Sequence, residues 1–186
     1  MKEQEYKSLI SKERYEEIKN AFVWDKEFEQ INHYYFDDND YIITNEITVR
    51  IREKSDSCKL QIKIPESIRS NIHVKNEFSM PFDRIPQFID GETINNLCGL
   101  NIGDVHKLGT LKTERCTKKI NDNVKLFLDK NDYLNITDYE VEIEYLNSVD
   151  EISDIVHELK LNESDVVYGK KTRFIRRLIS NKNSAL

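Results

Sequence analysis

A chain of 186 residues is long enough for one domain with a hydrophobic core, and its net charge of −6 argues against a general nucleic-acid binder. Its three cysteines lack the spacing of a disulfide framework or a zinc site, and no run of about 18 apolar residues could cross a membrane. The N-terminus carries acids where a secretory signal needs a basic and then an apolar segment, so we expect a soluble cytoplasmic protein.

The first predicted element is a strand that contains Glu-Gln-Glu-Tyr-Lys at residues 3–7. Successive side chains of a strand point to opposite faces, so Glu3, Glu5 and Lys7 share one face. Two carboxylates and an ammonium suit neither a hydrophobic core nor an ordinary edge strand. They suit a wet cavity that holds a metal ion and an anion, whereas the alternative is a solvated, irregular N-terminus.

The elements that follow carry no chemistry of their own. Ser11 can cap a helix that runs to about Phe22, and an aromatic strand is predicted over residues 28–37. The acids at residues 37–40 indicate a solvated turn, because the glycine and the distal glutamate of an EF-hand are missing.

Two strands over residues 47–52 and 59–64 alternate apolar and basic side chains, which predicts a hairpin with one cationic face. The bases of that face are Arg50, Arg52, Lys59 and Lys63. We expect Pro65 to end the second strand, because proline cannot donate to a sheet. A third strand, over residues 73–81, places on one face Lys75, Glu77 and Ser79.

The second half returns to strands after an interruption. Residues 83–105 predict short helices that cover one end of a sheet, and strands are expected over residues 108–117 and 124–129. After turns at residues 131–132 and 138, a strand over residues 139–145 puts three acids on one face: Glu140, Glu142 and Glu144.

The last elements are helical or basic. Ser148 and Glu151 form a capping box ahead of an amphipathic helix, and the tail over residues 166–179 is rich in lysine and arginine. No linker separates these segments, so we expect a single domain over residues 1–186.

About eight strands with short turns predict a mainly β (α+β) fold: an eight-stranded antiparallel barrel that closes into a tunnel, with flanking helices. If the two ends of the chain pair, four carboxylates come within reach of one another: Glu3, Glu5, Glu140 and Glu142. They would repel unless a hard cation such as Mg²⁺ or Mn²⁺ neutralised them. The facing bases match phosphate oxygens, whereas the alternative is that both charged faces lie on the exterior and bind only water.

The order of these motifs resembles the CYTH superfamily, the triphosphate tunnel metalloenzymes, and is closest to uncharacterised bacterial members. The similar positions are Glu3-x-Glu5-x-Lys7, Arg50-x-Arg52, Lys63 ahead of Pro65, Arg115, Asp129, Glu140-x-Glu142 and Lys170-x-x-Arg173-Phe174. One motif departs from the family: the middle strand reads Lys75-x-Glu77-x-Ser79, without a second acid. The resemblance implies a barrel around a triphosphate and Mg²⁺ or Mn²⁺, with a C-terminal helix near the tunnel.

The two charged walls and the resemblance together predict the roles of individual residues. One or two divalent cations would be held by Glu3, Glu5, Glu77, Asp129, Glu140 and Glu142. The phosphates would be bound by Lys7, Arg50, Arg52, Lys63, Lys75, Arg115, Lys170 and Arg173, with Lys171 as an alternative to Lys170. The groups expected to act in catalysis are Glu5, Glu142 and Lys7.

The predicted function is metal-dependent hydrolysis of a triphosphate: inorganic tripolyphosphate, thiamine triphosphate or a nucleotide. The expected partner is therefore a triphosphate-containing small molecule, with no general nucleic-acid binding and no membrane involved. The protein would be a monomer or a homodimer. Three alternatives remain: an adenylate cyclase, a non-catalytic binder of polyphosphate or nucleotide, and a purely structural barrel.

Overall fold

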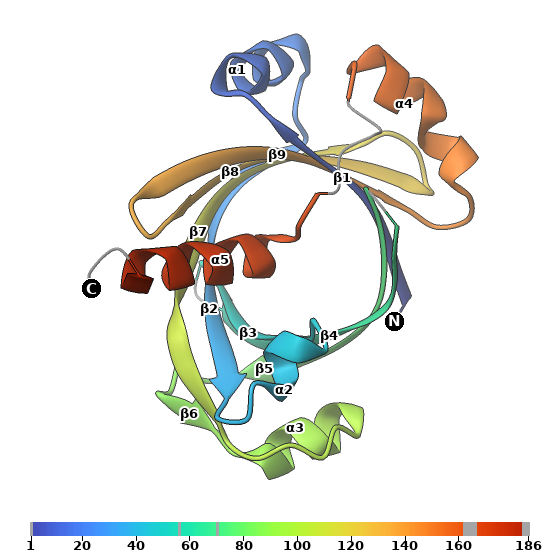
Figure 1. Ribbon diagram of the computed structural model, residues 1–186. Coiled ribbons are helices and arrows are strands. Elements are labelled where there is room, and N and C mark those ends of the chain that lie inside the picture. Colours follow the sequence, from blue (N-terminus) through green and yellow to red (C-terminus); the bar gives the residue numbers. More distant parts are fainter. Residues whose placement is uncertain (1, 56, 70, 162–166, 184–186) are drawn as a thin grey trace.

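A computed structural model describes residues 2–55, 57–69, 71–161 and 167–183. Nine antiparallel strands form one sheet, in which β2 also pairs with β7 and so closes eight of them into a barrel (Figure 1). The strands are β1 Lys2–Ile10, β2 Lys26–Asp37, β3 Thr48–Lys54, β4 Ser57–Arg69, β5 Ile72–Phe82, β6 Phe88–Ile89, β7 Val105–Lys119, β8 Val124–Tyr133 and β9 Ile136–Tyr145. The predicted eight-stranded barrel is confirmed, and the short β6 is an addition outside it that pairs with β7.

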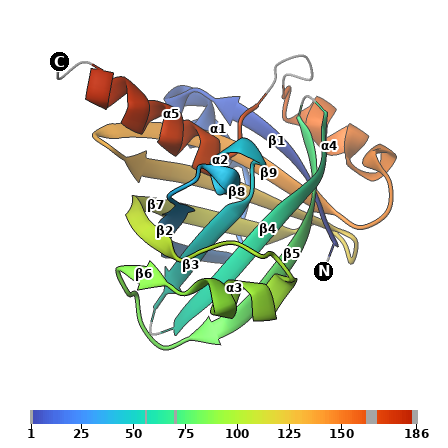
Figure 2. The same ribbon diagram turned by 60° about the horizontal axis from the view of Figure 1, so that its bottom comes forward.

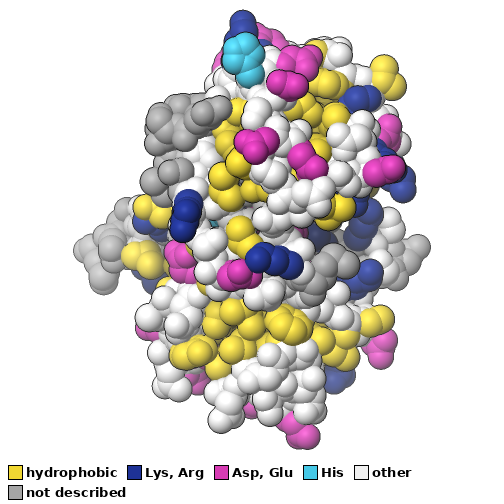
Figure 3. All heavy atoms as spheres, turned by 90° about the vertical axis from the view of Figure 1, so that its right-hand side faces the viewer, with side chains coloured by type: hydrophobic (Ala, Val, Ile, Leu, Met, Phe, Trp, Pro, Cys, Tyr) yellow, Lys and Arg dark blue, Asp and Glu magenta, His cyan; other side chains and the backbone are white. Residues whose placement is uncertain are grey.

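Helices flank the barrel, as predicted. They are α1 Lys12–Ala21, α2 Tyr41–Thr44, α3 Gly91–Cys98, α4 Ser153–Glu158 and α5 Lys170–Asn183, with a 3₁₀ turn at Val149–Ile152. None of the helices in the described residues is long and apolar enough to cross a membrane. On the side of the molecule that carries α4 above and α3 below, charged side chains of both signs are scattered among apolar ones (Figure 3).

The hydrophobic core lies outside the barrel, in two parts. One part joins the outer faces of β3 and β4 to α2 and α3, through residues such as Ile51, Leu60 and Ile94. The other joins β8 and β9 to α1 and α4, through residues such as Leu128 and Ile143. Burying each of these side chains contributes roughly 1.5–3 kcal/mol. Since the apolar alternation points outward, the polar side chains of the same strands are turned into the lumen.

The two ends of the chain pair as predicted, but in a register that sequence reasoning did not anticipate. β1 lies against β9 with Glu5 opposite Glu144, Lys7 opposite Glu142 and Leu9 opposite Glu140. Glu140 is therefore about 20 Å along the strand from Glu3, since a strand rises about 3.3 Å per residue. The expectation that these two carboxylates come within reach of each other is wrong.

Four local predictions are also corrected. Pro65 does not end its strand: β4 continues to Arg69, and an irregularity in the pairing between Pro65 and Ser67 accommodates the missing donor. Residues 83–105 hold one helix and the two-residue β6 rather than several helices. The predicted turns at residues 131–132 and 138 lie instead within β8 and β9. The hydroxyl of Ser148 accepts from the N–H of Asp150, so a 3₁₀ turn replaces the first turn of an α-helix.

Helix α5 lies across one end of the barrel (Figures 1 and 2). Its Phe174 is fully buried, with ring centroids 5.4 Å from Tyr34 and 6.2 Å from Tyr133. Gly109 on β7 makes room for this ring, because a Cβ there would lie 2.7 Å from the Cζ of Phe174. The helix is thereby fixed where its first turn, with Lys170 and Lys171, reaches the lumen.

Candidate active site

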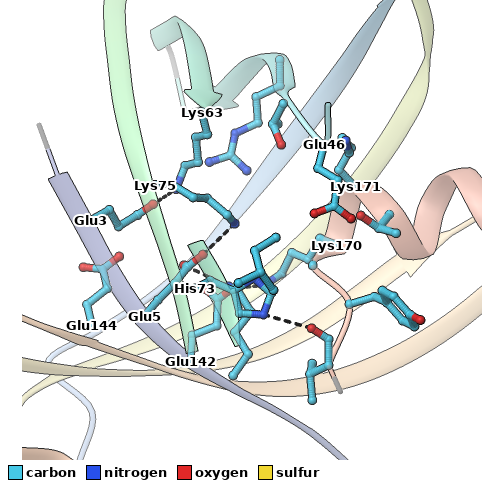
Figure 4. A pocket seen from close by; sticks show the side chains of 18 of the residues that line it. Glu3, Glu5, Glu46, Lys63, His73, Lys75, Glu142, Glu144, Lys170 and Lys171 are labelled. Atoms are coloured by element: carbon cyan, nitrogen blue, oxygen red, sulfur yellow. Dashed lines mark hydrogen bonds and ion pairs between the residues drawn. The ribbon is translucent and has the colours of Figure 1, made fainter. Parts of the chain in front are cut away.

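A cavity of about 260 Å³ occupies the lumen, and charged side chains dominate its wall (Figure 4). Among the described residues, eight bases line it: Lys7, Arg50, Arg52, Lys63, Lys75, Arg115, Lys170 and Lys171. Five carboxylates line it as well: Glu3, Glu5, Glu46, Glu142 and Glu144. The excess of bases makes the cavity a place for an anion, even though the chain as a whole is acidic.

The structure brings most of the predicted site residues to this cavity, but not all of them. Four do not line it: Glu77, Asp129, Glu140 and Arg173. Oxygens of Asp129, Glu140 and Glu142 lie within 4.8 Å of one another, which is close enough to share a cation. However, Lys170 already bridges all three, at 2.7–2.8 Å, and Arg173 binds Glu140 at 2.9 Å. The acids of this cluster are therefore already neutralised by Lys170 and Arg173 of the protein itself.

Glu142 is the point where the buried cluster meets the cavity. Its carboxylate accepts from Lys7 and Arg115, and from Lys170 at 2.8 Å. Arg115 in turn holds Asp129 with two parallel bonds of 2.7 and 2.6 Å. Burial opposes the charge of Glu142, but these three cations hold its pKa well below the usual value.

The opposite side of Lys7 faces β5 and β4. The carboxylate of Glu5 forms ion pairs with two lysines: its Oε2 lies 2.9 Å from Nζ of Lys7, and its Oε1 lies 2.9 Å from Nζ of Lys75. Although burial acts against it, these two ammonium groups hold the pKa of Glu5 well below its usual value. Lys63 pairs with Glu3 (Figure 4) and, at 3.0 Å, with Glu77. Glu5 and Glu142 are thus fixed in place as carboxylates by the same lysine between them.

Glu144 differs from the other carboxylates of the wall. Within the described part of the chain it has neither an ion pair nor a hydrogen bond, and burial together with the nearby Glu3 raises its pKa to about 7. Figure 4 shows Glu3, Glu5 and Glu144 side by side on the strands β1 and β9. Sequence reasoning saw Glu144 in the alternating acid run but assigned it no role. The oxygens of these three carboxylates are hard donors of the kind that Mg²⁺ or Mn²⁺ prefers, but in the described part of the chain only those of Asp129, Glu140 and Glu142 lie within 4.8 Å of one another.

Two guanidiniums on β3 lack a negatively charged partner. Arg50 donates from Nε to Gln61 at 3.1 Å, while its buried Nη2 has no partner, and Arg52 donates from Nε to Asn32 at 3.2 Å. No ion pair to a carboxylate forms at either guanidinium in the described residues. Burial, Arg50 and Arg115 together lower the pKa of Arg52. These groups lack the anion that would satisfy them, and a phosphate has the geometry to do so.

The end of the cavity beside α5 holds residues that the sequence left undecided or missed. Lys170 and Lys171 both line it, so the two are not alternatives. Lys171 donates to the carbonyl of Ile47 at 3.1 Å, and burial with the nearby Lys75 lowers its pKa to about 8 against the opposing charge of Glu46. The hydroxyl of Tyr34 is buried without a partner and reaches the same wall.

The model of the CYTH domain matches residues 1–176 of this chain. The chain belongs to the CYTH domain family. Because this match spans nearly the whole sequence, the barrel and its charged lumen are those of a CYTH domain.

Solved structures show the same fold. A proposed adenylate cyclase from Bacillus halodurans aligns with a TM-score of 0.71 and 24% identity, over 91% of this CYTH domain and 95% of that chain. HpAC1 from Hippeastrum, a proposed adenylyl cyclase with a dominant triphosphatase activity, aligns at 0.74 and 17%, over 94% and 95%. The RNA triphosphatase domain of a mimivirus capping enzyme aligns at 0.51 and 11%, over 85% and 87%. The search of curated proteins gave no match.

Proposed function

We propose that this CYTH domain is a metal-dependent phosphohydrolase that acts on a triphosphate anion bound inside the barrel. The observation that carries the proposal is that one cavity holds three groups without an opposite charge: the guanidiniums of Arg50 and Arg52, and the carboxylate of Glu144. A triphosphate with a divalent cation supplies both missing charges at once. A barrel with a purely structural role would gain nothing from leaving them open.

The residues of the cavity divide the work between them. Glu3, Glu5 and Glu144 would hold Mg²⁺ or Mn²⁺, which supplies charge neutralisation and water activation when bound. Arg50, Arg52 and the lysines of β4 and β5 would bind the phosphate oxygens, where negative charge spreads during an in-line displacement. Lys7 lies between Glu5 and Glu142 and pairs with both, which positions the two carboxylates relative to each other.

The test is an activity panel. Tripolyphosphate, thiamine triphosphate and nucleoside triphosphates are each assayed with Mg²⁺, Mn²⁺ and no metal, and released phosphate and any cyclic nucleotide are measured. We expect metal-dependent phosphate release from at least one substrate. The variants Arg52→Ala and Glu144→Gln should each lower kcat/KM by about 10²-fold or more, as removal of one charge-stabilising group does in other enzymes.

Matched controls separate the site from general damage. Arg84→Ala and Glu158→Gln remove an exposed arginine and an exposed glutamate elsewhere on the molecule and should leave the activity within about twofold of wild type. If folded Arg52→Ala and Glu144→Gln proteins retain full activity, the proposed site is wrong. Cyclic nucleotide as the main product would replace the hydrolase with a cyclase, and tight binding without turnover would replace it with a non-catalytic binder.

A further inference from the structure

The lumen faces of β2, β3 and β4 continue past the cavity to the end of the barrel. Arg52 lines the cavity, and Lys59 lies directly opposite it on β4. Lys54 is two residues further along β3, on the same face because side chains alternate. Lys26 lies two residues before Phe28 on β2, and Phe28 faces the cavity-lining Arg115 across the β2–β7 pair. We call Lys26, Lys54 and Lys59 the rim lysines.

The rim lysines lie at the end of the barrel opposite α5. Lys171 at the start of α5 contacts the carbonyl of Ile47, one residue before β3 begins, whereas Lys54 is the last residue of β3. Figure 2 shows β3 and β4 running away from α5 toward the hairpin that joins them. A molecule that reaches the cavity from this end therefore passes the rim lysines.

The rim lysines have no ion pair within the described part of the chain. Several lysines elsewhere on the surface are paired, although not all of them: Lys2 with Glu66 at 2.9 Å, Lys112 with Glu29 at 2.6 Å, and Lys130 with Glu114 at 2.9 Å. The charges that act most strongly on Lys54 are all of its own sign. Burial and then Lys26, Arg52, Arg115 and Lys59 lower the pKa of Lys54.

Arg50, Arg52 and Lys54 form a row of unpaired cations along one strand. The row runs about 13 Å, from the middle of the cavity to the end of the barrel, at about 3.3 Å per residue. A triphosphate held by the cavity wall would leave the outer part of this row unused. The row suits an anion that continues out of the barrel beyond the third phosphate.

The aromatic side chains beside the row argue for bare phosphate rather than nucleic acid. Single-stranded nucleic acids bind proteins by stacking their bases on exposed rings. Here the ring of Phe28 is covered by the ammonium of Lys54, 3.4 Å from its centroid, and the ring of Phe127 by the guanidinium of Arg115, at 4.4 Å. Both rings already carry a cation of the protein, so the rim offers charge without a stacking platform.

We propose that the rim lysines extend the substrate site to linear polyphosphate chains longer than tripolyphosphate, with the chain end in the cavity and the following phosphates on Lys54, Lys59 and Lys26. This proposal rests on the proposed triphosphatase function and adds a preference for chain length to it. Because the contacts are between charges at the surface, they act on affinity and are weakened by salt.

The experiment compares wild type with the triple variant Lys26→Gln, Lys54→Gln, Lys59→Gln. Hydrolysis of tripolyphosphate and of long-chain polyphosphate is measured with metal at several salt concentrations. We expect the variant to raise KM for the long chain at least about tenfold while leaving tripolyphosphate within about twofold. The slope of log KM against log salt for the long chain should fall by about two, since three phosphate contacts are lost.

A control variant, Lys2→Gln, Lys112→Gln, Lys130→Gln, removes the same charge from paired lysines away from the rim and should change the hydrolysis of neither substrate. Calorimetric titration of long-chain polyphosphate without metal tests the rim independently of turnover. An inactive wild type would therefore contradict the proposed hydrolase function, while the calorimetry would still decide the rim proposal. The rim proposal is overturned if both triple variants weaken the long chain equally. It is also overturned if wild type binds both chain lengths alike, or if only an RNA bearing a 5′-triphosphate depends on the rim.

Discussion

Individual charges in the lumen fall into two groups with different consequences. Glu5 and Glu142 are buried and held by two or three cations each, whereas Arg50, Arg52 and Glu144 lack an opposite charge. A paired buried charge stabilises its surroundings only as long as its partners remain. An unpaired one lowers the stability of the empty protein and becomes useful when the ligand arrives, which is the usual trade between stability and function.

This difference predicts opposite effects on stability. Glu142→Gln leaves the ammonium groups of Lys7 and Lys170 partly unpaired, so the free energy of unfolding should fall by about 3–5 kcal/mol. Arg52→Gln removes a guanidinium that burial and its neighbours already disfavour, so the unfolding free energy should stay the same or rise. Urea denaturation of both variants without ligand is the measurement. Equal destabilisation by the two changes would contradict this division of the charges.

His73 makes the stability of the protein depend on pH. It lies on the cavity wall, where its Nε2 contacts the carbonyl of Val167 at 3.0 Å, and burial with Lys7 and Lys75 lowers its pKa from 6.5 to about 4, against the charge of Glu5. Below pH 6.5 the unfolded chain takes up the proton first. The unfolding free energy therefore falls as the pH drops from 6.5 to 4, by roughly 3 kcal/mol at most.

The measurement is urea unfolding at several pH values between 4 and 7, for wild type and His73→Gln. The glutamine amide retains a donor toward Val167 but does not titrate in this range. The variant should therefore lose the part of the pH dependence that His73 contributes, while the part caused by carboxylates below pH 4.5 remains. Curves that stay parallel from pH 6.5 to 4 would show that the histidine does not titrate as its surroundings indicate.

The sequence revealed which side chains face the lumen more readily than which ones meet there. Alternation alone placed Glu3, Glu5 and Lys7 on one face, and the structure agrees. It could not give the register between β1 and β9, because strands more than 130 residues apart are aligned by the whole barrel. The actual register of β1 on β9 places Glu144, rather than the expected Glu140, beside Glu5. Because the register was unknown, the sequence assigned no role to Glu144.

At the scale of elements, β4 and α5 show where local rules were overridden. Proline at position 65 predicted the end of a strand. Pairing with β5 nevertheless continues, because the register shifts between Pro65 and Ser67 and so tolerates a residue without an N–H donor. The basic tail was recognised as a motif, but whether Lys170 or Lys171 points inward depends on how α5 lies. That position is fixed by Phe174, a contact with Tyr34 and Gly109 that no local pattern shows.

The packing of α5 predicts a non-additive pair of substitutions. Gly109→Ala places a methyl group 2.7 Å from the Cζ of Phe174, which must move, at a cost of about 1–3 kcal/mol. Phe174→Leu also destabilises, because it leaves the space of the ring tip empty. In the double variant the new methyl group occupies part of that space. The summed single losses should therefore exceed the double loss by about 0.5 kcal/mol or more, measured as a double-mutant cycle by denaturation. Strict additivity would mean that the ring does not press on this glycine.

At the scale of the whole molecule, the barrel is built with its apolar cores outside and its charges inside. Helices α2 and α3 pack on one part of the outer surface and α1 and α4 on another, so the lumen need not supply hydrophobic stabilisation. This arrangement permits eight bases and five carboxylates to line one cavity in a chain whose net charge is −6. The empty barrel thus holds an excess of positive charge, and most of its acids are already neutralised by lysine or arginine.

That imbalance predicts that tripolyphosphate alone stabilises the protein more than the metal ion alone does. Tripolyphosphate added without metal, in the presence of a chelator, meets uncompensated guanidiniums at once, whereas Mg²⁺ alone finds mainly acids that already have partners. At 100 times its dissociation constant a ligand adds about 2.7 kcal/mol. For a chain of this length that corresponds to a rise in Tm of roughly 5–10 °C.

The thermal shift is measured with tripolyphosphate alone, Mg²⁺ alone and both, at constant ionic strength set with sodium chloride so that general screening is the same throughout. Arg52→Ala should lose most of the shift caused by tripolyphosphate, because it removes a cation that has no carboxylate partner and is available to the phosphates. Arg84→Ala should keep the shift. Mg²⁺ alone should raise Tm by less than tripolyphosphate alone. The reverse order would mean that the carboxylates, rather than the guanidiniums, are the groups left unsatisfied in the empty barrel, and that the metal organises the site before the phosphates enter it.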